Sequence, residues 1–220
     1  MPLRAPLSAI LVYLEMLEHG RYGELTENGR KRTKLVENSC QRIVNLINSL
    51  LDVEKFASGT INLDLGLSEV ATIFERSVHS LAAIIEQNEL MLDVEGSELE
   101  LICDEERLTQ VIINLLSNAI KYSPNVATIK LAAKTTSDGI EFSVTDNGAG
   151  IPHEHRELVF GRFYQIPGQS KAGSSGLGLA ICKEIVKAHH GTIGVESNRG
   201  AGSRFWFIIP TKKETPVEPV

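Results

Sequence analysis

The segment Asn114-Leu115-Leu116-Ser117-Asn118-Ala119-Ile120-Lys121-Tyr122 closes a strongly helical run that spans residues 105–122. Asn114 and Asn118 are four residues apart, so both carboxamides project from one face of the helix, with Lys121 close to them. A carboxamide oxygen is a hard, neutral ligand that suits Mg²⁺, and a lysine can neutralise phosphate charge. The segment therefore predicts a metal–phosphate site; a polar face on an ordinary helix is the alternative.

A second polar segment, Asp146-Asn-Gly148-Ala-Gly150-Ile151, directly follows a predicted strand. A carboxylate at this place could accept a charge-assisted hydrogen bond from an exocyclic amine such as that of adenine. The two glycines would let the backbone approach the base closely. Asp-Asn-Gly is also typical of an ordinary turn, and the segment alone leaves both interpretations open.

Two glycine-rich segments follow. Gly173-Ser-Ser-Gly176-Leu177-Gly178-Leu179-Ala180-Ile181 opens a predicted helix, whose free N–H groups and positive end favour a phosphate. Its spacing is neither the Rossmann fingerprint nor the Walker pattern. Gly200-Ala-Gly202-Ser203-Arg-Phe205-Trp-Phe207, taken alone, indicates only a turn that leads into a strand.

The first part of the chain has a different pattern, with apolar residues in alternating steps of four and three. These stripes run over residues 3–18 and 33–56, and Thr26 is a suitable N-cap for the second helix. Two short helices with one narrow stripe each bury little surface alone. The pattern predicts a hairpin that pairs with a second copy into a four-helix bundle, through residues 3–56.

The remaining residues predict an α/β sandwich in which three helices cover one sheet, so that the whole chain is of the α+β class. The expected helices are residues 68–87, 105–122, 154–163 and 177–189, and the expected strands are 61–65, 90–94, 99–103, 127–133, 140–144, 192–195 and 203–209. Residues 165–175 are expected to form a mobile loop. The predicted domains are the hairpin (1–57), the sandwich (58–212) and a disordered tail (213–220).

Composition limits the partners. The 220 residues carry a formal net charge of −6, which gives no electrostatic support for binding nucleic acid. No apolar run approaches the roughly 20 residues that a membrane span needs. The three isolated cysteines fit a reducing cytosol. We therefore expect a cytoplasmic location, with any membrane link made through sensor regions outside this chain.

Together the four segments are far more specific than any one of them. Their order and separation resemble the histidine-kinase catalytic domain of the gyrase, Hsp90, histidine kinase and MutL ATPase superfamily. Residues 114–122 look like its Asn box, residues 146–150 and 176–181 like glycine boxes, and residues 200–203 like the last glycine box. Phe160-Gly-Arg162-Phe163 is similar to its Phe box.

The resemblance implies a site for ATP and Mg²⁺. By resemblance, Asn118 binds Mg²⁺ with support from Asn114, Lys121 meets phosphate, Tyr122 lies against adenine and Asp146 recognises the adenine amine. Residues 164–175 would form an ATP lid, in which Ser174 replaces a frequent glycine. Arg162 would help to place the γ-phosphate, or would make a structural salt bridge. The implied nucleotide-binding residues are Asn118, Tyr122, Asp146, Gly148, Gly150, Ile151, Phe163, Ser175, Gly176, Leu177, Gly178, Leu179 and Ser203.

The phosphoacceptor region departs from the family pattern. Leu3-Arg4-Ala5-Pro6-Leu7 resembles the end of the acceptor box, which puts Met1 at the acceptor position and Pro2 at the acidic one. Neither residue can serve as nucleophile or general base. His19 falls in the turn between the helices and is expected to be solvated. Two explanations are open: a chain cut at the box, or a natural kinase that has lost its acceptor.

The resemblance implies an ATP:protein-histidine phosphotransferase module whose own acceptor histidine is absent from this chain. It also implies a homodimer that acts on a response regulator receiver domain. A nucleotide-dependent dimeric signalling scaffold without autophosphorylation is the alternative. An ATPase of the gyrase or MutL type is disfavoured, because those relatives carry a general-base glutamate where this chain has Asn114.

Overall fold

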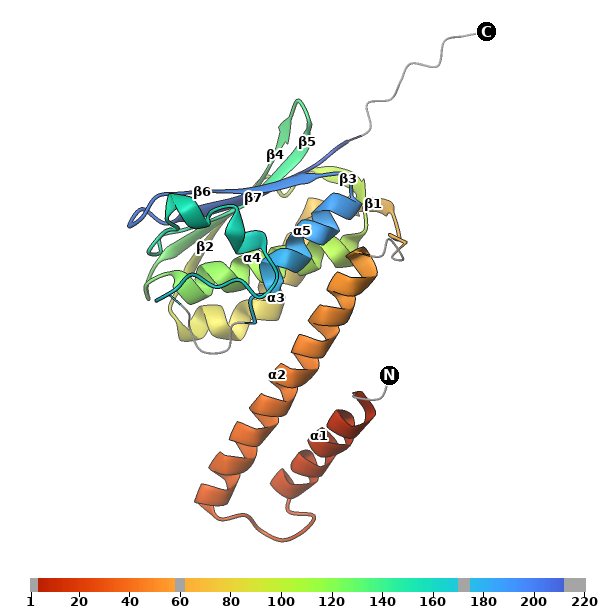
Figure 1. Ribbon diagram of the computed structural model, residues 1–220, viewed down its shortest axis with the longest axis vertical. Helices are drawn as coiled ribbons and strands as arrows, with labels where there is room; N and C mark the ends of the chain where they lie inside the picture. The colour runs from red at the N-terminus through yellow and green to blue at the C-terminus, as the bar shows by residue number, and fades with distance from the viewer. Residues whose placement is uncertain (1–3, 58–61, 170–174, 212–220) are drawn as a thin grey trace. The chain divides into compact units, whose positions relative to one another are not determined.

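The computed structural model describes residues 4–57, 62–169 and 175–211, which fall into two compact units, residues 1–52 and 53–220 (Figure 1). The first unit contains α1 (Arg4–Glu18) and most of α2 (Glu27–Ala57), and the chain reverses direction between the two helices. In the described residues no helix is long and apolar enough to cross a membrane.

Thr26 caps α2 as the sequence predicts. Its Oγ1 accepts a hydrogen bond from the Gly29 backbone N–H at 3.1 Å, which satisfies a donor that the first helical turn leaves free. The apolar stripe is only partly covered within one hairpin. Leu14 and Cys40 are buried, whereas Val36 and Ile43 keep 47% and 45% of their surface exposed.

The second unit is built on a five-stranded sheet with the order β2-β4-β5-β7-β6. Its strands are β2 (Met91–Glu95), β4 (Thr128–Thr136), β5 (Gly139–Asp146), β7 (Ser203–Ile209) and β6 (Thr192–Ser197). All neighbours are antiparallel except β2 and β4. The helices α3 (Val70–Gln87), α4 (Glu105–Tyr122) and α5 (Gly178–Ala188) lie along one face of the sheet (Figure 1).

The prediction of a single sheet was wrong. β1 (Gly66–Glu69) and β3 (Glu100–Cys103) pair with each other and form a separate two-stranded sheet. The strand expected at residues 61–65 is also misplaced, because residues 62–65 have no regular structure and Ile61 lies outside the described residues. Apolar alternation continues to Leu67, which is 73% exposed, so the pattern here does not mark a buried face.

The helix expected at residues 154–163 is absent as well. Two short 3₁₀ turns, η1 (His153–His155) and η2 (Leu158–Phe160), take its place. Phe163 has a φ of +60°, a left-handed conformation that a right-handed helix cannot contain. Val159 and Phe160 are both buried although they are adjacent, so the apolar residues here do not follow helical spacing.

The core lies between the sheet and the three helices. Phe142 of β5 stacks on Phe207 of β7 with ring centroids 4.8 Å apart, and Phe74 of α3 meets Phe142 edge-on at 6.1 Å. One face of α4 is fully buried against this core; its residues are Leu108, Val111, Ile112, Leu115 and Leu116. Their helical spacing leaves the polar side of α4, which carries Asn114 and Asn118, free to line a site.

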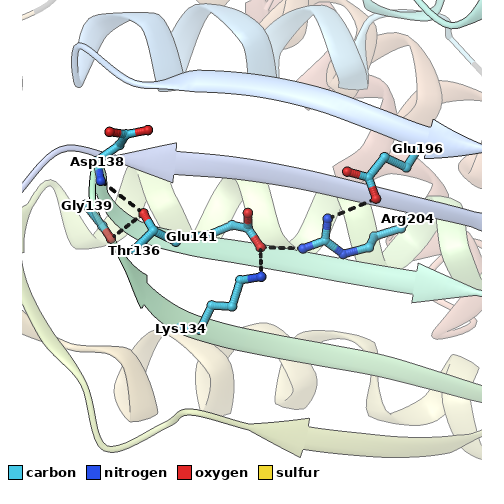
Figure 2. Close-up of polar contacts among 7 residues, drawn as sticks. All are labelled: Lys134, Thr136, Asp138, Gly139, Glu141, Glu196 and Arg204. Carbon is cyan, nitrogen blue, oxygen red and sulfur yellow. Dashed lines mark hydrogen bonds and ion pairs between the residues drawn. The ribbon is translucent and has the colours of Figure 1, made fainter.

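The opposite face of the sheet carries an ion-pair network centred on Glu141 (Figure 2). Lys134 Nζ lies 3.0 Å from Glu141 Oε1, and Arg204 pairs with Glu141 and also, at 3.3 Å, with Glu196. Burial alone would raise the pKa of Glu141, but Lys134 and Arg204 outweigh it and hold that pKa below its usual value. The network therefore links strands β4, β5, β7 and β6 on the outer surface.

His189 joins the start of α4 to the end of α5. The ring is buried, its Nδ1 lies 2.9 Å from the Ile185 carbonyl oxygen, and its Nε2 accepts the Asp104 backbone N–H at 3.0 Å. Because that N–H can only donate, the ring is neutral and its proton is on Nδ1. Burial lowers the pKa of His189, while the Ile185 carbonyl and the Asp104 carboxylate act in the opposite direction.

We expect the free energy of unfolding to fall as the pH is lowered through this titration. The folded pKa of His189 lies below its ordinary value of 6.5, so the unfolded chain takes up the proton first. Stability that is present above pH 6.5 is then lost as the pH falls through the folded pKa. His189→Gln should be about 1–3 kcal/mol less stable than the parent at neutral pH, by urea unfolding, because buried hydrogen bonds are lost.

The difference in the free energy of unfolding between the parent and His189→Gln should become smaller toward acid pH, because glutamine does not titrate. His79→Gln, on the exposed surface of α3, is the matched control and should change the free energy of unfolding at neutral pH little. If the difference in the free energy of unfolding between the parent and His189→Gln stayed constant with pH, this account would be contradicted.

Candidate functional site

A cavity in the second unit is enclosed by the polar side of α4, the loop after β5, the residues around η2 and the starts of α5 and β7. Its lining residues are Asn114, Ser117, Asn118, Lys121, Tyr122, Asp146, Ala149, Gly150, Ile151, Val159, Tyr164, Gln165, Ile166, Gln169, Ser175, Gly176, Gly178, Leu179, Ser203 and Phe205. Residues from all four polar and glycine-rich segments thus meet at one place, although they are up to about ninety residues apart in the chain.

The C-terminal half of α4 supplies the amide and cationic groups. Asn114, Asn118 and Lys121 line the cavity together, as their helical spacing predicts. The Asn114 Nδ2 lies 3.5 Å from the Gly178 carbonyl oxygen at the start of α5, which ties this carboxamide to the next helix. The Lys121 Nζ lies 5.8 Å from the centre of the Tyr122 ring.

Asp146 ends β5 and is 5% exposed. Its Oδ1 accepts the Gly148 backbone N–H at 2.7 Å. Burial raises the pKa of Asp146, whereas hydrogen bonds from the backbone of Gly148 and Ser203 act in the opposite direction. A carboxylate held in this way keeps acceptor capacity that faces the cavity.

The glycines of the loop after β5 make close contacts with protein backbone. A Cβ on Gly148 would lie 2.6 Å from the Tyr122 carbonyl oxygen at the end of α4. Gly150 has a φ of +71°, and a Cβ there would lie 2.0 Å from the Asn198 carbonyl oxygen. Any larger residue would therefore push the loop away from α4 or from the β6–β7 turn.

The start of α5 forms another part of the wall. Ser175 Oγ accepts the Leu177 backbone N–H at 3.2 Å. Gly176 has a φ of +68°, and a Cβ there would lie 2.7 Å from the Phe163 carbonyl carbon. The two ends of the segment between Phe163 and Gly176 are therefore in contact, while residues 170–174 of that segment lie outside the described residues.

Some of the expected site residues do not line the cavity. These are Gly148, Arg162, Phe163 and Leu177. Leu177 is 1% exposed and belongs to the core, whereas Phe163 is 60% exposed. Gly148 acts on the site indirectly, through its bond to Asp146 and its contact with α4.

Sequence reasoning missed several lining residues. Ser117, three residues after Asn114, could have been found from helical spacing. Tyr164 begins the expected lid but was not named as a site residue; its hydroxyl lies 2.6 Å from His155 Nδ1 in η1, a contact that only the fold creates. Ala149 and Phe205 belong to the quoted segments, and Gln165, Ile166 and Gln169 to the expected lid, but none of them was named as a site residue. Val159 lies outside every predicted segment of the site.

The donor groups fit Mg²⁺ better than a transition metal. Asn114 and Asn118 on α4, together with Gln165 and Gln169, give the cavity four carboxamides, beside the Asp146 carboxylate and the Lys121 cation. In the described part of the chain no three His, Cys, Asp or Glu side chains gather into a metal-ligand cluster. Mg²⁺ keeps several waters and takes few protein oxygens together with phosphate oxygens, so a sparse neutral set is sufficient.

Known proteins match both parts of the chain. The family model described as histidine kinase-, DNA gyrase B-, and HSP90-like ATPase matches residues 103–213, and the His Kinase A (phospho-acceptor) domain model matches residues 3–59. The solved structure of full-length ShkA in complex with AMPPNP superimposes with a TM-score of 0.81 at 26% identity, covering 97% of this chain and 45% of that one.

Curated relatives are named as histidine kinases. The circadian input-output histidine kinase CikA of Synechococcus elongatus is 33% identical over 224 residues, which cover 99% of this chain and 29% of CikA. The sensor histidine kinase WalK of Bacillus subtilis is 33% identical over 217 residues, which cover 96% of this chain and 35% of WalK. The chain spans about a third of the length of these two relatives. Its cavity unites the family's motifs, and the chain belongs to the histidine kinase-, DNA gyrase B- and HSP90-like ATPase family, joined here to a His Kinase A hairpin.

Proposed function

We propose that this chain is the ATP-binding catalytic core of a two-component sensor histidine kinase, which transfers the γ-phosphoryl group of ATP to a protein histidine. The observation that carries the proposal is the meeting of Asn114, Asn118, Lys121 and Asp146 around one cavity. The proposed domains are the hairpin (residues 1–57), the ATP-binding domain (58–212) and the tail (213–220).

The nucleotide is bound by groups with separate tasks. Asp146 accepts a hydrogen bond from the adenine amine, and Tyr122 lies against the base. Lys121 neutralises phosphate charge, and the glycine-rich start of α5 offers backbone N–H groups to the phosphates. Residues 164–175, of which residues 170–174 lie outside the described residues, are proposed as the lid. Arg162, two residues before it, is proposed to help place the γ-phosphate or to make a structural salt bridge; it does not line the cavity in this structure.

Asn118, supported by Asn114, would hold Mg²⁺ through its carboxamide oxygen. When bound, the ion draws negative charge away from the transferred phosphoryl group. The chain's own residues position the nucleotide and neutralise its charge, which is most of what phosphoryl transfer requires of a protein. Asn114 occupies the place of a general base in hydrolytic relatives and cannot take a proton, which favours transfer over hydrolysis.

The hairpin is proposed to form a homodimer through residues 3–56, and the kinase is proposed to work with a response regulator receiver domain. The acceptor position of the hairpin is Met1 in this chain, so the histidine that receives the phosphoryl group is not one of the described hairpin residues. The half-exposed stripe residues, among them Ile10, Val36, Ile43 and Leu50, support the dimer because one hairpin leaves them in water. A membrane link, where the whole protein has one, is proposed to run through sensor regions outside this chain.

Replacing Asp146 by Asn should weaken ATP binding. The change removes a charged acceptor, which is worth about 1.5–3 kcal/mol, or roughly tenfold to a hundredfold in Kd. Isothermal titration calorimetry with Mg-ATP measures the loss. Asp138→Asn makes the same change of charge in the exposed β4–β5 turn and should bind Mg-ATP with the affinity of the parent. Equal affinities of the parent and Asp146→Asn would contradict the assignment of the adenine amine.

The chain should be a dimer at micromolar concentration, with about twice the monomer mass by light scattering. A chain without residues 1–56 should remain a folded, ATP-binding monomer. Ile43→Lys places a charge on the half-exposed stripe and should dissociate the dimer, whereas Asn38→Lys, which is exposed beside the stripe, should not. A monomeric parent would count against the bundle.

With radiolabelled ATP and Mg²⁺, this chain should not gain an acid-labile, base-stable phosphoryl group, because Met1 and Pro2 stand where the family has its acceptor and acidic residue. Met1→His with Pro2→Glu, extended by several helical residues upstream, should restore labelling. Asn118→Ala in that background should abolish it, because the metal loses its ligand. A restored chain that binds ATP yet never labels would refute the kinase proposal and favour a scaffold.

A further inference from the structure

Three buried polar residues lie side by side across the inner face of the sheet. Asp146 of β5 is paired in register with Ser203 of β7, and Ser203 with Ser197 of β6. We call these residues the polar row; they are 5%, 7% and 8% exposed. Asp146 and Ser203 line the cavity, whereas Ser197 stands one strand behind them. Buried hydroxyls are costly unless they are hydrogen-bonded, so the partners of Ser197 need to be accounted for.

Ser197 Oγ has three partners. It accepts the Ile151 backbone N–H at 2.7 Å and donates to the Gly202 carbonyl oxygen at 2.6 Å. The third partner is Ser203 Oγ, at 3.0 Å. Ile151 belongs to the loop after β5 and Gly202 to the β6–β7 turn, so one hydroxyl ties together the two segments that build this wall of the cavity.

The direction of the hydrogen bond between the two serines follows from counting protons. A hydroxyl has one proton and two lone pairs. The Gly202 carbonyl can only accept, so it takes the Ser197 proton, and the Ile151 N–H occupies one lone pair. The contact between Ser197 and Ser203 therefore forms only if Ser203 donates its proton to the second lone pair.

We propose that Ser197 is a positioning residue that sets base specificity by holding the Ser203 hydroxyl proton away from the cavity. Ser203 then offers the cavity lone pairs only, and the ionised carboxylate of Asp146 beside it is also an acceptor without a proton. This part of the wall can receive a hydrogen bond but cannot give one. It selects a purine with an amine at position 6 against a purine with a carbonyl oxygen there.

The inference rests on the proposed nucleotide site and is tested with ADP and IDP, which differ at position 6 and are not phosphoryl donors here. Kd values for both are measured by calorimetry at pH 8 for the parent, Ser197→Ala, Ser203→Ala and the double variant. In Ser197→Ala the Ser203 hydroxyl is free to rotate and to donate to the 6-carbonyl. The preference for ADP over IDP should fall by about tenfold, the usual effect of one hydrogen bond.

The double variant distinguishes a role through Ser203 from loosening of the fold. Once Ser203 is alanine, Ser197→Ala should leave the ADP-to-IDP ratio unchanged. The matched control is Ser143→Ala. Ser143 is a buried serine of β5 that lies opposite Trp206 of β7 and is not part of the polar row. This variant should keep the parental ADP-to-IDP ratio of Kd values. The inference would be overturned if Ser197→Ala weakened the binding of ADP and of IDP equally. It would also be overturned if Ser197→Ala still changed the ADP-to-IDP ratio in a chain that already carries Ser203→Ala.

Two further outcomes are also decisive. If Ser197→Ala does not fold, Ser203→Ala alone decides. It should weaken the binding of ADP more than the binding of IDP. Equal weakening of the binding of both nucleotides would show that the Ser203 hydroxyl rotates freely, which would contradict the inference. A parent chain that binds neither nucleotide would contradict the nucleotide site itself and the inference with it. A parent that binds ADP, with the same ADP-to-IDP ratio in every variant, would contradict the roles of Ser197 and Ser203 but not the nucleotide site.

Discussion

Burial of one face of α4 against the five-stranded sheet is the constraint on which the site depends. The residues of that face, Leu108, Val111, Ile112, Leu115 and Leu116, have no exposed surface. Rotating the helix about its axis would bring these side chains into water, at a cost of roughly 1.5–3 kcal/mol for each. The apolar face therefore fixes the direction of Asn114, Asn118 and Lys121, which line the cavity from the other side of the same helix.

The second constraint is the mutual packing of the loop after β5 and the β6–β7 turn. Gly202 has a φ of +75°, and a Cβ there would lie 2.0 Å from the Asp146 carbonyl oxygen. Gly150 makes an equally close approach to Asn198. Arg156 adds hydrogen bonds to the Ser197 carbonyl oxygen and, at 3.1 Å, to Asn198 Oδ1. Two glycine motifs that are some fifty residues apart thus form one wall, and Asp146 is held at its edge.

The hairpin follows a different energetic principle from the ATP-binding domain. Its helices begin and end at local signals such as the Thr26 cap, and its ion pairs, including Lys31 with Glu27 and Lys34 with Glu37, are on the surface and contribute little. Its apolar stripe stays half-exposed in one copy. The core of the ATP-binding domain forms within one chain, whereas the half-exposed stripe of the hairpin is what the proposed dimer would cover.

Local periodicity was enough to determine part of this protein. The helix at residues 105–122 and the strand at residues 203–209 have the predicted bounds, because each is long and strongly patterned. The spacing of Asn114, Asn118 and Lys121 on one helix likewise required no knowledge of the fold. Resemblance to a family then supplied roles for these residues that no periodicity contains.

Tertiary structure decided what depends on pairing between distant segments. Nothing local shows that β1 pairs with β3 outside the main sheet, or that Phe163, at the end of the segment expected to be a helix, adopts a left-handed conformation. Ser197 carries no motif; its place in the polar row comes from the register of β6 on β7 and of β7 on β5. Register is set by core packing and by turns far along the chain, so the sequence by itself determined which groups this protein has for binding a nucleotide, and only the fold decided which way their protons and lone pairs point.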